Sequence, residues 1–88
     1  MDNRLHEEIV RTVRKIVFVL DSEFRNELKA TTERELSDFH FGLGVWIRNN
    51  ILTNDSAVYR IFVENGIIEK DDMSAILIRE LRCTLLGK

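Results

Sequence analysis

The spacing of apolar residues along the chain predicts helices joined by short connections. In the first segment, about residues 3–20, apolar residues recur every three or four positions, which is the period of a helix with one buried face. These apolar residues are Leu5, Ile9, Val13, Ile16, Val17 and Leu20. The segment therefore predicts a helix that packs on a core, with Arg11, Arg14 and Lys15 on its opposite side.

Three further segments are expected to be amphipathic helices: about residues 22–29, 57–65 and 72–86. Each begins beside a residue whose side chain can accept hydrogen bonds from the first backbone N–H groups of a helix. The cap candidates are Asp21 or Ser22, then Ser56, then Asp71 or Asp72. The helix over 57–65 is expected to end at Gly66, because glycine readily adopts the left-handed conformation that closes a helix.

The fifth segment, about residues 33–52, contains the most apolar part of the chain. Thr32 and Glu35 form the pattern of a capping box, in which each side chain satisfies the other residue's backbone N–H. One apolar stripe comprises Leu36, Phe39, Leu43, Trp46 and Ile47, and a second, on the reverse side, comprises Phe41, Val45 and Leu52. A helix with two apolar sides is typically covered on both, so 33–52 predicts the central helix of the domain.

Two features of residues 33–52 leave alternatives open. Gly42 and Gly44 each cost a helix about 1 kcal/mol relative to alanine, which indicates either the close approach of a neighbouring backbone or a kink. Residues 39–47 also alternate with period two, as a strand does, but the capping box and the lack of a partner strand favour the helix. Together the segments predict an all-α, compact bundle of about five helices, one domain over residues 1–88.

Two motifs resemble the signature of a family of small, mostly bacterial domains of unknown function. The first is H-F-G-L-G at residues 40–44 followed by I-R-N at 47–49, and the second is the helix start D-D-M-S at 71–74. The likeness covers about residues 5–86. Family members carry a proline before the paired aspartates, where this chain has Lys70. The resemblance implies an α-helical fold, and it implies no reaction, cofactor or partner.

Composition and charge narrow the classes of function. The formal net charge of −2 gives no bulk attraction to nucleic acid or to an anionic membrane. No apolar run approaches the roughly 20 residues needed to cross a bilayer, and the first residues do not resemble a signal peptide. We therefore expect a cytoplasmic protein that does not contact membranes. Cys83 is the only cysteine, so no disulfide forms within the chain.

The strongest candidate for a ligand site is a polar group near the end of the 33–52 segment, consisting of His40, Arg48, Asn49 and Asn50. Helical spacing places His40 and Arg48 on one edge, and an arginine presents a planar fork to phosphate or carboxylate. An anionic ligand such as a nucleotide is one interpretation. The other is structural, with Arg48 pairing to Asp71 or Asp72 as a lock between helices. The lack of a glycine-rich phosphate loop favours the structural interpretation.

The last segment carries a candidate interface. Its members, Ile76, Arg79, Cys83 and Leu86, follow the three-four-three spacing of a helix–helix seam. They lie away from the face that is expected to be buried. This stripe predicts contact with another protein or with a second copy of the chain, unless the short helix over 22–29 covers it.

No catalytic or metal-binding pattern is recognisable in the sequence. His6 and His40 are the only histidines and lie on different segments, whereas a metal site needs three or four converging ligands. The serines lack the strained turn that surrounds a nucleophile. We therefore expect no catalytic residue, no metal and no cofactor.

A group of basic residues in the first segment is a further candidate for a binding surface. The first segment carries a basic stripe with one aromatic residue: Arg4, Arg11, Arg14, Lys15 and Phe18. A stripe of this kind can contact RNA or DNA, although Glu7, Glu8 and the net acidity disfavour that interpretation. We expect a non-enzymatic protein-interaction module that regulates or inhibits another protein. Anionic-ligand binding at His40, Arg48 and Asn49 is the first alternative, and nucleic-acid contact through the first segment is the second.

Overall fold

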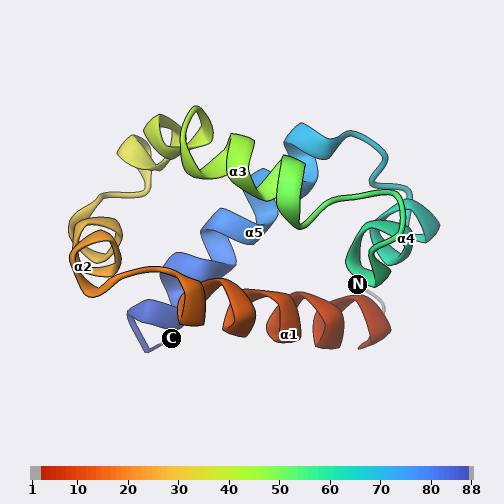
Figure 1. Cartoon of the computed structure of the whole chain (residues 1–88), viewed down its shortest axis with the longest axis horizontal. Coiled ribbons are helices and arrows are strands. Elements are labelled where there is room, and N and C mark those ends of the chain that lie inside the picture. The colour runs from red at the N-terminus through yellow and green to blue at the C-terminus, as the bar shows by residue number, and fades with distance from the viewer. Residues whose placement is uncertain (1–2, 88) are drawn as a thin grey trace.

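The computed structural model describes residues 3–87, apart from the side chain of His40, and this part of the chain folds into six helical segments without strands (Figure 1). In chain order they are α1 (Asn3–Val19), α2 (Ser22–Ala30), the 3₁₀ helix η1 (Arg34–His40), α3 (Leu43–Asn50), α4 (Ala57–Glu64) and α5 (Lys70–Leu85). The all-α class expected from the sequence is therefore confirmed. The strand alternative for residues 39–47 is wrong, because this stretch is helical on both sides of a turn.

Helix α5 occupies the centre of the molecule. It crosses between α1 on one side and η1 and α3 on the other, and it also packs against α2 (Figure 1). Helix α4 packs against α1 at the far end from α2. The central position that the sequence analysis gave to residues 33–52 therefore belongs to α5. Its side chains Met73, Leu77, Ile78 and Leu81 are fully buried.

The inner face of α1 forms as its apolar spacing predicts. Leu5, Ile9, Val13 and Ile16 are buried, together with Thr12. The basic residues predicted for the opposite side, Arg11, Arg14 and Lys15, are exposed. This buried face packs on α4 and α5, which supply Val58, Phe62, Met73, Leu77, Ile78 and Leu81 to the same core.

Two of the predicted helix starts have the expected caps, and the third does not. Asp21 accepts a hydrogen bond from the backbone N–H of Phe24 at 2.7 Å, and Ser56 accepts one from Tyr59 at 3.2 Å. The prediction that Asp71 or Asp72 caps the last helix is wrong, because α5 begins at Lys70, and both aspartates lie in its first turn. Carboxylates there still face the positive end of the helix dipole.

The end of α4 is set by Gly66, as the sequence predicts. Gly66 has φ 83°, the left-handed conformation that only glycine adopts without a steric penalty. The N–H of Ile67 donates to the carbonyl of Phe62 at 2.9 Å, and that of Gly66 donates to Val63 at 3.0 Å. These two bonds form a Schellman motif, which satisfies carbonyls at the helix end.

The prediction of a single long helix over residues 33–52 is wrong, because the structure has two separate helices there, η1 and α3. Half of the predicted Thr32–Glu35 capping box is present: the backbone N–H of Glu35 donates to the Thr32 hydroxyl at 3.3 Å, whereas the Glu35 carboxylate accepts from the Thr32 hydroxyl at 2.8 Å. It opens a 3₁₀ helix, in which residues three apart share one edge, so Leu36 and Phe39 both face the core. The chain then turns at Phe41 and Gly42 before α3 begins.

The expectation that residues 33–52 are buried on two sides is also wrong. Phe41, a member of the second apolar stripe, is 88% exposed, and Val45 is 40% exposed. Leu52 is fully buried, but it lies beyond the end of α3. Because the helix is interrupted at Gly42, Phe41 no longer shares a helical face with the residues that follow it. The interruption thus creates an exposed apolar surface on this side of the molecule.

Candidate functional site

A pair of aromatic rings brings α2 and η1 together. The rings of Phe24 and Phe39 meet edge to face, with centroids 5.7 Å apart and an interplanar angle of 82°. Both side chains are half-buried and pack against the core. This geometry is favourable because the positive edge of one ring meets the negative face of the other. Each ring of the pair lines one of two neighbouring hollows in the surface.

The first hollow, here called the apolar hollow, has a volume of about 290 Å³. It is lined by residues from the end of α1, from α2 and from the start of α3: Val19, Leu20, Phe24, Gly42, Leu43 and Trp46. Val19 is 63% exposed although it is apolar. A methyl group added at Gly42 would meet no atom within 4 Å, so the backbone turn leaves this side of the hollow open.

The second hollow, here called the acidic hollow, has a similar volume of about 290 Å³. It is lined by Glu27, Thr31, Glu35, Asp38 and Phe39. The Thr32 hydroxyl donates to a Glu35 carboxylate oxygen at 2.8 Å, which holds that side chain in place. Within residues 3–87, none of the three carboxylates forms an ion pair. Negative charge therefore gathers beside the apolar hollow.

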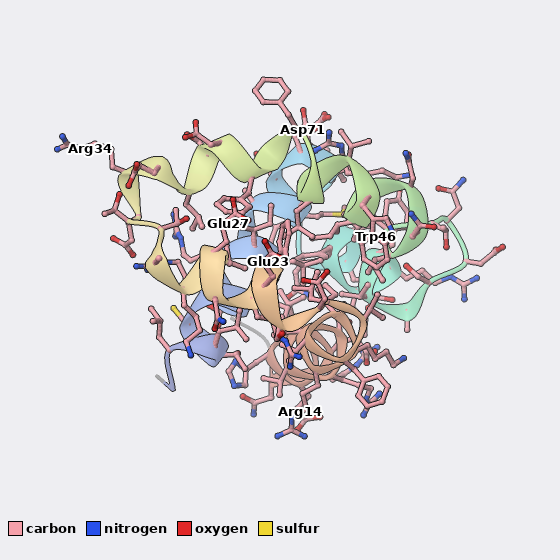
Figure 2. All side chains as sticks on the ribbon, turned by 60° about the vertical axis from the view of Figure 1, so that its left-hand side comes forward. Arg14, Glu23, Glu27, Arg34, Trp46 and Asp71 are labelled. Atoms are coloured by element: carbon pink, nitrogen blue, oxygen red, sulfur yellow. The ribbon has the colours of Figure 1, made fainter. Side chains whose placement is uncertain are left out.

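The charges of α2 are divided between its two sides. Glu23 and Glu27 are one turn apart and share a side, whereas helical spacing places Arg25 and Lys29 on the other. Arg25 donates to the backbone carbonyl of Asp21 at 3.4 Å. Figure 2 looks onto the α2 end of the molecule, with both glutamates on α2 and Trp46 farther to the right on α3. The side of α2 that carries Glu27 is thus the side that borders the acidic hollow.

Arg48 joins the end of α3 to the first turn of α5. Its Nη1 lies 3.3 Å from Oδ1 of Asp71 and donates to the hydroxyl of Ser74, also at 3.3 Å. Ser74 is fully buried and donates in turn to the Asp71 carbonyl at 3.0 Å. A buried hydroxyl with both partners present avoids the free-energy cost of an unsatisfied polar group. Asp72 is exposed and makes no ion pair within the described residues.

Within the polar group predicted as a ligand site, Asn50 has different surroundings from Arg48. The amide of Asn50 donates to the Trp46 carbonyl at 3.0 Å, and Asn50 lines a hollow of about 280 Å³ shared with α1 and α4. Asn49 is exposed. The side chain of His40 lies outside the described part of the chain. Arg48 and Asn50 therefore contact different parts of the molecule.

The stripe predicted as an interface on α5 is partly covered. Ile76, Cys83 and Leu86 are half-buried, and Arg79 is exposed. Helix α2 packs against α5, and Nε of Arg82 donates to the carbonyl of Thr31 at 2.8 Å, so the chain just after α2 is tied to α5. Arg79 lines a hollow of about 510 Å³ with Glu33, which precedes η1, and with residues of η1 itself.

The basic stripe of α1 is an exposed surface of mixed charge. Arg11 pairs with Glu8 at 3.1 Å, and Arg4 pairs with Glu64 at 3.5 Å. A hollow of about 530 Å³ along this helix is lined by His6, Glu7, Val10, Arg11, Arg14 and Lys15. Phe18 is 91% exposed, although aromatic side chains are usually at least partly buried.

Among the described side chains, no three His, Cys, Asp or Glu residues come close enough together to hold a metal ion. None of the helices within residues 3–87 combines the length and apolar character that a bilayer-spanning helix requires.

Sequence reasoning missed most of the residues that line the two hollows. Val19 lies off the buried stripe of α1. An apolar residue outside that stripe is the sequence feature that could have indicated an exposed contact surface. Glu27, Glu35 and Asp38 come from two different elements, so only the packing of α2 on η1 brings them together. Trp46 was assigned to the core, but it is half-buried and lines the apolar hollow.

Comparison with known proteins places the chain in a family. The family model described as a domain of unknown function (DUF6794) matches residues 7–85. The chain belongs to this family. The match confirms the expected membership in a family of unknown function, and it covers α1 from residue 7 onward and all of the later helical segments. No curated protein and no solved structure matches the chain.

Proposed function

We propose that this domain is a non-enzymatic protein-interaction module whose contact surface is the apolar hollow together with the adjoining acidic hollow. The observation that carries the proposal is the exposed apolar concavity lined by Val19 and Trp46. Leaving such carbon surface in water is unfavourable, and covering it with a partner recovers that free energy. By occupying a surface of its partner, the domain would regulate or inhibit that protein.

The make-up of this surface resembles that of protein interfaces. An apolar centre that includes an aromatic side chain, Trp46, is bordered by polar groups from α2 and η1. Tryptophan is enriched among the residues that dominate binding energy. The volume, about 290 Å³, lies at the lower end of the range for small-molecule pockets, and it suits one or two side chains of a partner.

Site-specific photo-cross-linking tests this proposal. A benzoylphenylalanine at position 19 is expected to capture a partner protein in the source cell, because Val19 borders the apolar hollow. The matched control is position 68, since Ile68 is also apolar and is 64% exposed, compared with 63% for Val19. The purified partner should then bind Val19→Ser more weakly than Ile68→Ser. Equal capture from both positions, or equal binding by both variants, would contradict the proposal.

A second candidate function is contact with single-stranded nucleic acid through α1. It is supported by the exposure of Phe18, which lies on the same side of the helix as Arg11 and Arg14. Bases stack on exposed aromatic rings, and arginines contact the backbone phosphates. A mobility shift at low ionic strength that disappears in Phe18→Ser would support this candidate. No shift at any salt concentration would remove it.

The anionic-ligand alternative at His40, Arg48 and Asn49 also stays a prediction. A nucleotide that binds only the folded chain raises its melting temperature. A thermal-shift screen with nucleotides should therefore show stabilisation that is lost in Asn49→Ala, a change at an exposed position. No stabilisation by any nucleotide would count against this alternative.

A further inference from the structure

We propose that the contact surface takes an amphipathic segment of a partner protein that carries lysine or arginine. An apolar side chain of the segment enters the apolar hollow, and a basic side chain enters the acidic hollow. This inference rests on the proposed function and adds the chemical class of the partner.

The first support is the position of the two hollows relative to each other. Phe24 lines the apolar hollow, Phe39 lines the acidic one, and the two rings are in contact at a centroid distance of 5.7 Å. A segment that crosses this pair of rings therefore contacts both hollows at once. An amphipathic helix suits this arrangement, because residues three and four positions apart project from the same side.

The second support is the charge around the apolar hollow. Glu27, Glu35 and Asp38 line the adjoining hollow, and no cationic side chain within residues 3–87 forms an ion pair with any of them. Glu23 lies one turn from Glu27 on the same side of α2. A cation placed there gains attraction without first displacing an internal partner. Complementary charge of this kind selects among partners and speeds association.

The same charges argue against other occupants. Carboxylates beside the hollow repel the phosphates of a nucleic acid, so the surface disfavours RNA and DNA. An acidic or purely apolar segment would leave these carboxylates without a cationic partner as water is excluded, at a cost in free energy. A second copy of the chain offers Arg14, Lys15 and Phe18 on the outer face of α1, so self-association must be tested as an alternative occupant.

The intrinsic fluorescence of Trp46 provides a test of this proposal. Trp46 lines the apolar hollow and is the only tryptophan, so its fluorescence reports occupancy of that site. The test titrates the protein with a short amphipathic peptide of leucine and lysine that contains no tryptophan or tyrosine. The control peptide has glutamate in place of every lysine. The lysine peptide is expected to change the Trp46 emission saturably and to bind at least about tenfold more tightly than the control peptide.

Charge-removing variants localise the effect. Glu27→Gln and Asp38→Asn should each weaken binding of the lysine peptide by about two- to fivefold at low salt, as expected for exposed ion pairs. Glu69→Gln removes the same charge from an exposed position outside both hollows and should leave the affinity unchanged. All three substitutions are at exposed residues, and circular dichroism checks that each variant is folded.

Four results would overturn the proposal. The first is no emission change with the lysine peptide, and the second is equal affinity for the glutamate peptide. The third is sedimentation showing a dimer that Val19→Ser disrupts, because a second copy would then be the occupant. Cross-linking at position 19 to a partner whose contact segment lacks basic residues would also reject this inference while leaving the proposed function intact. Failure of that cross-linking would instead reject the proposed function.

Discussion

At the scale of single residues, Arg48 shows how a polar side chain can look functional in the sequence and have structural contacts in the fold. Its guanidinium contacts Asp71 and the buried hydroxyl of Ser74, each at 3.3 Å. The Arg48 side chain is 24% exposed, whereas that of Asp71 is 83% exposed, so water screens much of the ion pair. The hydrogen bond to the buried Ser74 is therefore the larger contribution to stability.

We predict that Arg48→Met lowers the free energy of unfolding by about 1–2 kcal/mol, because the ion pair and the bond to Ser74 are both lost. Urea denaturation followed by circular dichroism measures the change. Arg60→Met is the matched control, since Arg60 meets Asp55 only at 4.0 Å and both side chains are exposed. It should not change stability measurably. Unchanged stability in Arg48→Met, with loss of binding to a ligand, would show that Arg48 serves function rather than structure.

The pairing of Arg48 with an aspartate in the first turn of α5 was within reach of sequence reasoning, but its buried partner was not. An arginine and two nearby aspartates suggest an ion pair in the sequence alone. That Ser74 is fully buried, and that Asp71 rather than Asp72 faces Arg48, depends on the rotation of α5 about its axis. That rotation is set by the packing of Met73, Leu77 and Ile78 in the core.

At the scale of elements, the turn at Phe41 and Gly42 decides where the exposed apolar surface lies. The apolar spacing of residues 33–52 is compatible with one long helix, and the sequence does not distinguish that helix from η1 followed by α3. Leu36, Leu43 and Ile47 belong to the apolar stripe predicted for one long helix, and the structure also buries all three. In the interrupted arrangement that the structure shows, Phe41 is exposed and the apolar hollow lies beside Gly42. The other boundaries were predictable because local signals mark them, such as Asp21, Ser56 and Gly66.

Two glycine substitutions should change the stability of the domain in opposite directions. Gly42 has a negative φ of −95°, and an added methyl group meets no atom within 4 Å, so Gly42→Ala should raise stability by about 0.4–1 kcal/mol through lower entropy of the unfolded chain. Gly66 has φ 83°, so Gly66→Ala should lower stability by about 1–2 kcal/mol. Thermal unfolding of both variants measures these two changes in stability. If Gly42→Ala were the more destabilising of the two, the backbone assigned to this turn would be wrong.

At the scale of the whole molecule, the domain is built around α5, with the apolar and acidic hollows on the surface formed by α1, α2, η1 and α3. The all-α class follows from helical periodicity in every segment, and the sequence alone sufficed to predict it. The identity of the central helix did not follow from the sequence. The high apolar content of residues 33–52 favours that segment as the central helix. The structure instead places α5 at the centre and buries its Met73, Leu77, Ile78 and Leu81 completely. Which apolar residues stay exposed depends on all the helices together.

A contrast between two phenylalanines tests this distribution of core and surface. Phe62 is fully buried, so Phe62→Ala should cost about 3–5 kcal/mol, a large share of the roughly 4–13 kcal/mol typical of a domain this size. Phe41 is 88% exposed, so Phe41→Ala should change stability by less than about 0.5 kcal/mol. Chemical denaturation gives both values. A large loss in Phe41→Ala would show that its ring packs inside the domain.

The most direct test of the central claim is nuclear magnetic resonance of the isotope-labelled chain titrated with the leucine–lysine peptide. Amide shifts map the contact surface residue by residue without assuming which element is involved. We predict that the largest changes fall at the end of α1, in α2, in η1 and at the start of α3, around Phe24, Phe39 and Trp46. Changes confined to the outer face of α1 or to the exposed side of α5 would contradict the account.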